Sequence, residues 1–173
     1  MKQGIIIGTS PGREKWLHDF MESITVPCVV LNVEGYELGK IRWAYENTDF
    51  DRFIFLQDSL VIKNNQLLES VFDVTGSACL MCDPDHFGSY LGLYERSVLD
   101  KVGIPVAHTK VDAIKYEWEW TKKYVEACDN LDHPINLNHQ IVYTVYKHGR
   151  ENMLYINDVY EKWKGDWGQI NHS

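Results

Sequence analysis

The sequence lacks any apolar run that approaches the roughly 18 residues a membrane-spanning helix requires. Its N-terminus shows no signal-peptide pattern either, so we expect a cytoplasmic protein. Basic residues are in short supply, and the net charge of −8 argues against a surface built to bind nucleic-acid phosphates. The chain does have 173 residues of which 45% are apolar, which is enough for one folded domain with its own core.

Cysteine is scarce as well. The chain has four, too few for a disulfide scaffold at this length. Cys79 and Cys82 form a C-x-x-C pair, but no second pair completes a zinc site. The pair also lies in a strand-like run, where alternate side chains face opposite sides. We therefore expect no metal or redox role for these two cysteines.

The loop after the first apolar run lacks both common nucleotide-binding patterns. Gly8 is followed by Thr-Ser-Pro-Gly-Arg-Glu-Lys, which does not contain the Gly-Lys-Ser/Thr of a phosphate loop. The dinucleotide fingerprint G-x-G-x-x-G is absent too. A nucleotide that binds here must do so by another geometry.

The elements that are present alternate between strand and helix. Residues 4–8 form a short β-branched run, residues 14–24 place apolar side chains at helical spacing, and residues 28–33 read as a second strand. Such a βαβ unit predicts a right-handed crossover and an α/β domain. The other predicted helices cover residues 38–47, 65–72 (capped by Asn65), 96–102, 111–128 and 138–148, and the other predicted strands cover residues 53–56, 77–82, 90–94 and 153–156. We expect one domain over residues 1–173, with residues 150–173 as an irregular segment packed on it.

The most informative stretch is the strand predicted at residues 53–56. This unbroken run of Phe, Ile, Phe and Leu is typical of a strand buried on both faces, and it stops at Gln57, Asp58 and Ser59. Ligands of open α/β sheets bind beyond the carboxyl ends of the strands, which places Asp58 well for chemistry. A structural role is the alternative, because Asp often begins a turn or caps a helix.

The order and spacing of four segments resemble glycosyltransferases of the A-type fold, in a shortened form. The match covers roughly residues 4–125. Its segments are the loop from Thr9 to Arg13 with Leu17 and Phe20, the run Gly39, Ala44 and Asn47 before residues 53–59, the stretch 88–105 with Tyr94, Arg96, Asp100 and Gly103, and the run 116–120 with its two glutamates. Gln57, Asp58 and Ser59 stand where that family has its Asp-x-Asp motif, so the motif is degenerate here.

The resemblance implies a mostly parallel central sheet with helices on both faces, related to the Rossmann fold. It also implies transfer of a sugar from a nucleotide-diphosphate donor, with a UDP-sugar favoured, to an unidentified acceptor hydroxyl, with inversion. Mn²⁺ or Mg²⁺ would be held at Asp58, because these ions accept oxygen ligands and keep several waters. The residues implied for the donor are Thr9, Arg13, Glu34, Arg42, Gln57, Asp58 and Ser59.

The same resemblance assigns the acceptor side. Glu117 is the expected general base, since it shares a helix face with Trp120 and Tyr124, whereas Glu119 lies about 200° away around the helix. Trp120 is expected to stack on a sugar ring. Asp85, His86 and Tyr90, in or next to a polar loop, complete the expected acceptor side.

Two other functions fit the same sequence. One is a nucleotide-sugar-binding module that has lost turnover, which the missing second Asp makes plausible. The other is a nucleotidyltransferase, which the absence of a glycine- and lysine-rich first loop disfavours. Donor hydrolysis by the purified protein separates an enzyme from a binding module.

Overall fold

The computed structural model describes residues 1–73, 80–82, 87–128, 140–141, 153–156 and 158–163. Its central sheet has five strands in the order β2-β1-β3-β6-β5. The strands are β1 (Gln3–Gly8), β2 (Val29–Leu31), β3 (Arg52–Gln57), β5 (Leu80–Cys82) and β6 (Phe87–Glu95). β2, β1 and β3 are parallel, whereas β6 and β5 join antiparallel. The mixed sheet and its helices confirm the predicted α/β class.

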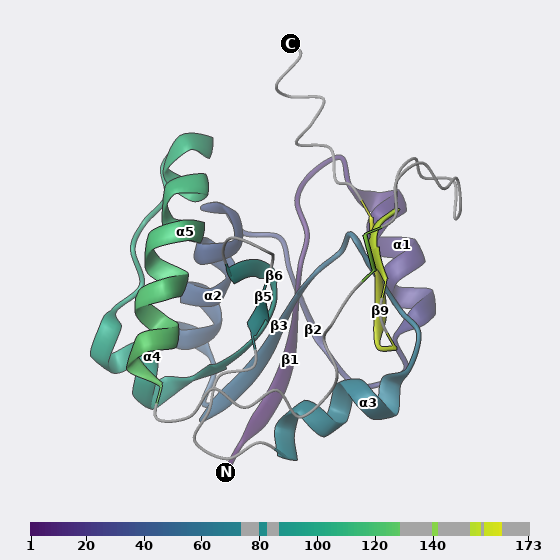
Figure 1. Ribbon diagram of the computed structural model, residues 1–173, viewed down its shortest axis with the longest axis horizontal. Coiled ribbons are helices and arrows are strands. Elements are labelled where there is room, and N and C mark those ends of the chain that lie inside the picture. Colours follow the sequence, from purple (N-terminus) through teal and green to yellow (C-terminus); the bar gives the residue numbers. More distant parts are fainter. Residues whose placement is uncertain (74–79, 83–86, 129–139, 142–152, 157, 164–173) are drawn as a thin grey trace.

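Helices cover both faces of this sheet. They are α1 (Glu14–Ser23), α2 (Tyr36–Asn47), α4 (Arg96–Val102) and α5 (Lys110–Ala127). Figure 1 shows α2, α4 and α5 on one side of the sheet and α1 on the other. Because side chains alternate along a strand, Ile5 and Ile7 of β1 pack with Phe20 of α1, while Ile6 packs with Ile41 of α2. The sheet is therefore buried on both faces.

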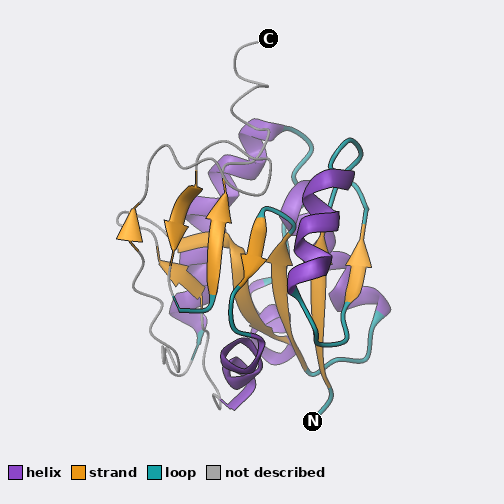
Figure 2. Cartoon of the chain, turned by 90° about the vertical axis from the view of Figure 1, so that its right-hand side faces the viewer, coloured by secondary structure: helices purple, strands orange, loops and turns teal. Residues whose placement is uncertain are grey.

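A second, smaller sheet lies beside α1 (Figure 1), on the side of the molecule that faces the viewer in Figure 2. Its order is β4-β9-β8-β7, and all its pairs are antiparallel. The strands are β4 (Leu60–Ile62), β7 (Gln140–Ile141), β8 (Met153–Ile156) and β9 (Tyr160–Trp163). β9 is buried at every position. The strand predicted at residues 153–156 is confirmed.

This second sheet corrects two predictions. Residues 150–173 are not irregular throughout, because β8 and β9 fall within them. The helix predicted at residues 138–148 is wrong where it can be checked, since Gln140–Ile141 is a strand; its other residues lie outside the described part of the chain. The N-cap of the helix predicted at residues 65–72 is Asn64 and not Asn65. The Asn64 side chain accepts from the Leu67 N–H at 3.0 Å and caps α3 (Asn65–Glu69), which a 3₁₀ turn (Ser70–Asp73) follows.

The pairing of the strands brings three segments to one place. Gly8 and Gln57 end β1 and β3 side by side, and the Asp58 N–H donates to the Gly8 carbonyl at 3.1 Å. β9 arrives from the other sheet, where Lys162 pairs in register with Leu60, and the Trp163 N–H donates to the Ser59 carbonyl at 3.0 Å. The loop after β1, the end of β3 and strand β9 therefore meet at the carboxyl edge of the parallel strands.

Candidate functional site

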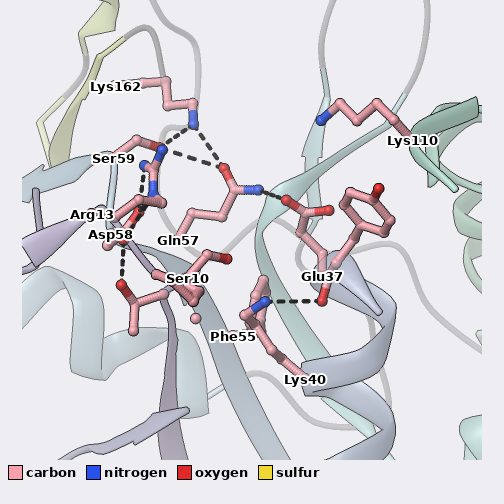
Figure 3. A pocket seen from close by; sticks show the side chains of 14 residues that line it. Ser10, Arg13, Glu37, Lys40, Phe55, Gln57, Asp58, Ser59, Lys110 and Lys162 are labelled. Carbon is pink, nitrogen blue, oxygen red and sulfur yellow. Dashed lines mark hydrogen bonds and ion pairs between the residues drawn. The ribbon is translucent and has the colours of Figure 1, made fainter. Parts of the chain in front are cut away.

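A cavity of about 330 Å³ opens at this edge, and we call it the carboxyl-edge cavity. Figure 3 shows its lining side chains. The acidic and basic side chains among them are Arg13, Lys40, Lys110, Lys162, Glu37 and Asp58. Four cations against two carboxylates leave an excess of two positive charges, in a chain whose net charge is −8. The cavity therefore favours an anion.

Asp58 forms the most tightly connected part of the cavity wall. It is 2% exposed, and Arg13 donates to it through Nε, at 2.9 and 3.0 Å from the two carboxylate oxygens, and through a terminal nitrogen at 2.6 Å. Thr9 Oγ1 donates to the second oxygen at 2.7 Å. The guanidinium of Arg13 also lies over the Trp16 ring, 5.2 Å from its centroid. The structure thus brings together Thr9, Arg13 and Asp58, all three predicted as donor-binding residues.

Lys162 enters the same cavity from β9. Its Nζ donates to Gln57 Oε1 at 2.9 Å and to Ser59 Oγ, while the amide nitrogen of Gln57 donates to the Glu37 carboxylate (Figure 3). Burial lowers the pKa of Lys162 to about 8, and the positive charge of Arg13 adds to this effect. The carboxylates of Glu37, Asp58 and Glu117 oppose the shift. Gln57 and Ser59 therefore hold a buried lysine ammonium in position.

Lys40 lies on the α2 side of the cavity. Its Nζ donates to the carbonyls of Val33 and Tyr36 at 3.2 Å each, and burial lowers its pKa. The absence of a side chain at Gly8 makes room for the Lys40 stem, since a Cβ there would lie 2.7 Å from Lys40 Cδ. Lys110, from the start of α5, places its Nζ 5.6 Å from the centroid of the Tyr36 ring. The cations thus reach the cavity from four separate segments of the chain.

The contacts of Asp58 do not fit the divalent cation that was predicted there. Both carboxylate oxygens already accept from Arg13 and Thr9 at hydrogen-bond distances, whereas Mg²⁺ requires oxygens at about 2.0–2.1 Å. The neighbouring positions, Gln57 and Ser59, add neutral groups that accept from Lys162. In the described part of the chain, the groups close enough to share a metal are His18, Asp19 and Glu22 on α1, and none of them lines the cavity.

An adjoining cavity of about 850 Å³ shares Ser10, Pro11, Tyr36 and Lys40 with the first. Glu34 and Arg42, both predicted to contact the donor, lie here and not in the carboxyl-edge cavity. Arg42 donates to the carbonyl of Ile104 and pairs with Glu46 at 3.6 Å, so its guanidinium is tied to the cavity wall.

Glycines shape the turn that carries Glu34 into the adjoining cavity. Gly35 has a φ of +93° and Tyr36 a φ of +60°, so the chain turns sharply from β2 into α2. A Cβ at Gly39 would lie 1.9 Å from the Glu34 carbonyl oxygen, so only glycine allows the helix to pack this closely on the loop. The two cavities therefore meet around the beginning of α2.

The acceptor-side predictions have mixed outcomes. Glu117 is half-buried on α5 and lies near enough to Lys162 to raise its pKa, whereas Glu119 is 64% exposed and pairs with Lys115. Asp85 and His86 lie outside the described residues, as does the side chain of Tyr90 in β6. Glu117 is not among the residues that line either cavity, and its role as general base stays a prediction.

Trp120 is not a sugar platform. It is 4% exposed, donates from Nε1 to the Gly103 carbonyl at 2.7 Å, and packs against Tyr94 and Tyr124. On the same helix, Ile114 and Trp118 are 47% and 45% exposed, so Trp120 and Tyr124 lie on the face that packs on the core. The aromatic side chains of this helix face serve the core because they are large and can satisfy their polar atoms with backbone groups.

Several cavity residues were not predicted from the sequence. Glu37 and Lys40 could have been found, because they lie three residues apart around the first residue of the helix predicted at residues 38–47, next to the loop after β2. Lys110 and Lys162 carry no such signal. Lys162 in particular follows a glutamate in a charged stretch that is typical of a solvated surface.

Comparison with known proteins shows that the fold of this chain is similar to that of solved structures. No protein-family model and no curated protein sequence matches the chain. Among solved structures, a mutant of Drosophila β1,4-galactosyltransferase 7 in complex with manganese, UDP-Gal and xylobiose is similar with a TM-score of 0.58 at 11% identity, covering 98% of this chain and 74% of that one. The catalytic domain of the same enzyme with xylobiose gives 0.57 at 11% identity, covering 96% and 72%. The chain therefore has a glycosyltransferase A-type fold. Within its described residues, no helix has both the length and the apolar character to cross a membrane.

Proposed function

We propose that this chain transfers a sugar from a nucleotide-diphosphate donor to an acceptor hydroxyl. The observation that carries the proposal is the carboxyl-edge cavity, which has an excess of two positive charges at the ends of β1 and β3 in an otherwise acidic chain. Ligands of open α/β sheets bind at this edge. A diphosphate, with its concentrated negative charge, suits such a cavity better than a neutral sugar does.

The donor would span both cavities. Its diphosphate would lie against Arg13, Lys40 and Lys162, and its nucleoside would extend into the adjoining cavity between Glu34 and Arg42. The exposed carboxylate of Glu34 can accept hydrogen bonds from ribose hydroxyls. A UDP-sugar is the favoured donor, since UDP-Gal is bound in the similar Drosophila enzyme.

Manganese is also present in that Drosophila complex. A bound divalent cation would supply charge neutralisation of the leaving diphosphate. In this chain Asp58 holds Arg13 instead, so no step of the reaction is assigned to a metal.

The chemistry is a single displacement at the anomeric carbon. The acceptor oxygen forms a bond to that carbon while the bond to the β-phosphate oxygen breaks, and the nucleoside diphosphate leaves. The hydroxyl proton passes to Glu117, which acts as general base and implies inversion. The cationic groups of the cavity stabilise the negative charge that develops on the leaving group.

A panel of nucleoside diphosphates in a thermal-shift experiment tests donor binding, with each nucleotide added in Mn²⁺ and in EDTA. We expect one base to raise the melting temperature more than the others. Slow hydrolysis of the matching nucleotide sugar then distinguishes an enzyme from a binding module of the same fold. Release of inorganic pyrophosphate from a nucleoside triphosphate and a sugar phosphate would instead indicate a nucleotidyltransferase.

A cytoplasmic location stays a prediction.

A further inference from the structure

We infer that Lys162, together with Arg13 and Lys40, binds the donor diphosphate in place of a divalent cation, so that donor binding does not require a metal. This inference rests on the proposed function and adds to it the chemistry that holds the leaving group. It also assigns a ligand-binding role to strand β9.

The position of Lys162 supports a role in ligand binding. Its side chain is 6% exposed, its strand is buried at every position, and its Nζ reaches the cavity that Asp58 and Arg13 also line. Burial of an ammonium group is costly, as the lowered pKa of Lys162 shows. A bound diphosphate would offset this cost directly, because it brings negative charge to the cation.

Hydrogen bonds hold Lys162 at this place. Gln57 Oε1 and Ser59 Oγ, both neutral, accept from its Nζ. The resemblance noted in the sequence places these two residues at the first and third positions of the Asp-x-Asp motif, where carboxylates would be available to a metal. In this chain both side chains orient a lysine instead, so Gln57, Ser59 and Lys162 form one hydrogen-bonded arrangement.

Arg13 and Lys40 approach from other elements. Arg13 precedes α1 and is fixed by Asp58, while Lys40 comes from α2 and is fixed by the carbonyls of Val33 and Tyr36. A divalent cation placed among these three would meet like charges and would have to compete with the Arg13 guanidinium for the carboxylate of Asp58. The other carboxylate of the cavity, Glu37, already accepts from the Gln57 amide nitrogen. A diphosphate meets opposite charges on all three elements, and a guanidinium suits phosphate oxygens.

The test is calorimetric titration with UDP, and with ADP, CDP and GDP in parallel, in EDTA and in Mn²⁺. Wild type is compared with Lys162→Met and with Lys122→Met, a control that removes a lysine 69% exposed on α5. We expect equal affinity in EDTA and Mn²⁺ for the wild type, a loss of about tenfold or more for Lys162→Met in both buffers, and no change for Lys122→Met. Lys162→Arg, which keeps the charge, should retain most of the affinity.

Two results would overturn the inference while leaving the proposed function intact. One is binding that Mn²⁺ strengthens tenfold or more in the wild type, a comparison that does not depend on any variant folding. The other is a folded Lys162→Met protein that binds as the wild type does. Failure of all four nucleotides to bind in either buffer would overturn the proposed function and this inference together.

Discussion

Replacing Asp58 by Asn should destabilise the protein without abolishing donor binding. Asp58 is 2% exposed and its partner Arg13 is 17% exposed, so the substitution leaves a largely buried guanidinium without its counter-charge. Loss of one member of a buried ion pair costs about 3–5 kcal/mol. We expect the lower end, about 3 kcal/mol, because Asn keeps an oxygen that can accept from Thr9 and Arg13 has some access to water. For a chain of 173 residues this corresponds to a fall of about 6–12 °C in melting temperature.

Titration of Asp58→Asn with UDP distinguishes between two roles of Asp58, which are holding Arg13 and binding the donor. If Asp58 only holds Arg13, its loss makes the cavity more positive, and UDP should bind in EDTA at least as tightly as it binds to the wild type. Asp49→Asn is the matched control, since Asp49 pairs with Lys2 at the exposed surface and should affect neither quantity. Thermal melts and calorimetry measure the two effects separately. Wild-type stability in Asp58→Asn, or loss of UDP binding, would refute this reasoning.

Three further predictions concern the base, the lysine and the core. Glu117→Gln should lower transfer about 10²-fold or more with UDP affinity nearly unchanged, whereas Glu119→Gln should be silent in the same steady-state assay. UDP affinity should fall as pH rises above 8: the pKa of Lys162 is about 8 and a bound diphosphate raises it, so binding above pH 8 takes up a proton. Calorimetry in buffers of different ionisation enthalpy measures that uptake, and Lys162→Arg should abolish it; equal uptake in the variant would assign the proton to another group. Trp120→Phe removes the hydrogen bond from Nε1 to the Gly103 carbonyl, so the free energy of unfolding should fall by about 1–2 kcal/mol in denaturant melts. The KM for the acceptor should not change, and a raised KM would indicate that Trp120 contacts the acceptor.

The fold was most predictable where local pattern and burial agree. Residues 14–24, 38–47 and 96–102 bury one helical stripe each, and the corresponding helices α1, α2 and α4 lie within two residues of the predicted ranges. Strand β9 was missed because Glu161 and Lys162 interrupt its apolar residues. Their burial depends on long-range contacts, such as that of Lys162 with Gln57, which no local pattern encodes.

In the candidate site, too, some residues could be predicted from the local pattern and others depend on long-range packing. Thr9, Arg13 and Asp58 follow parallel strands, and the carboxyl ends of neighbouring parallel strands meet, so their convergence was predictable. That Asp58 would pair with Arg13 and not be open to the expected cation depends on side-chain packing. Trp120 was misjudged because an aromatic side chain on a helix suits a core as well as a sugar, and only its burial decides between the two.

Donor cleavage by the purified protein tests the central claim most directly. The measurement is release of nucleoside diphosphate from a panel of nucleotide sugars, followed over time with wild type and Glu117→Gln at equal concentration. The account predicts that the wild type hydrolyses one donor slowly, faster when a suitable acceptor is supplied, and that Glu117→Gln binds the same nucleotide but releases far less of it. A wild-type protein that binds the nucleoside diphosphate yet cleaves none of these sugars, with or without acceptors, would contradict the account and leave a binding module.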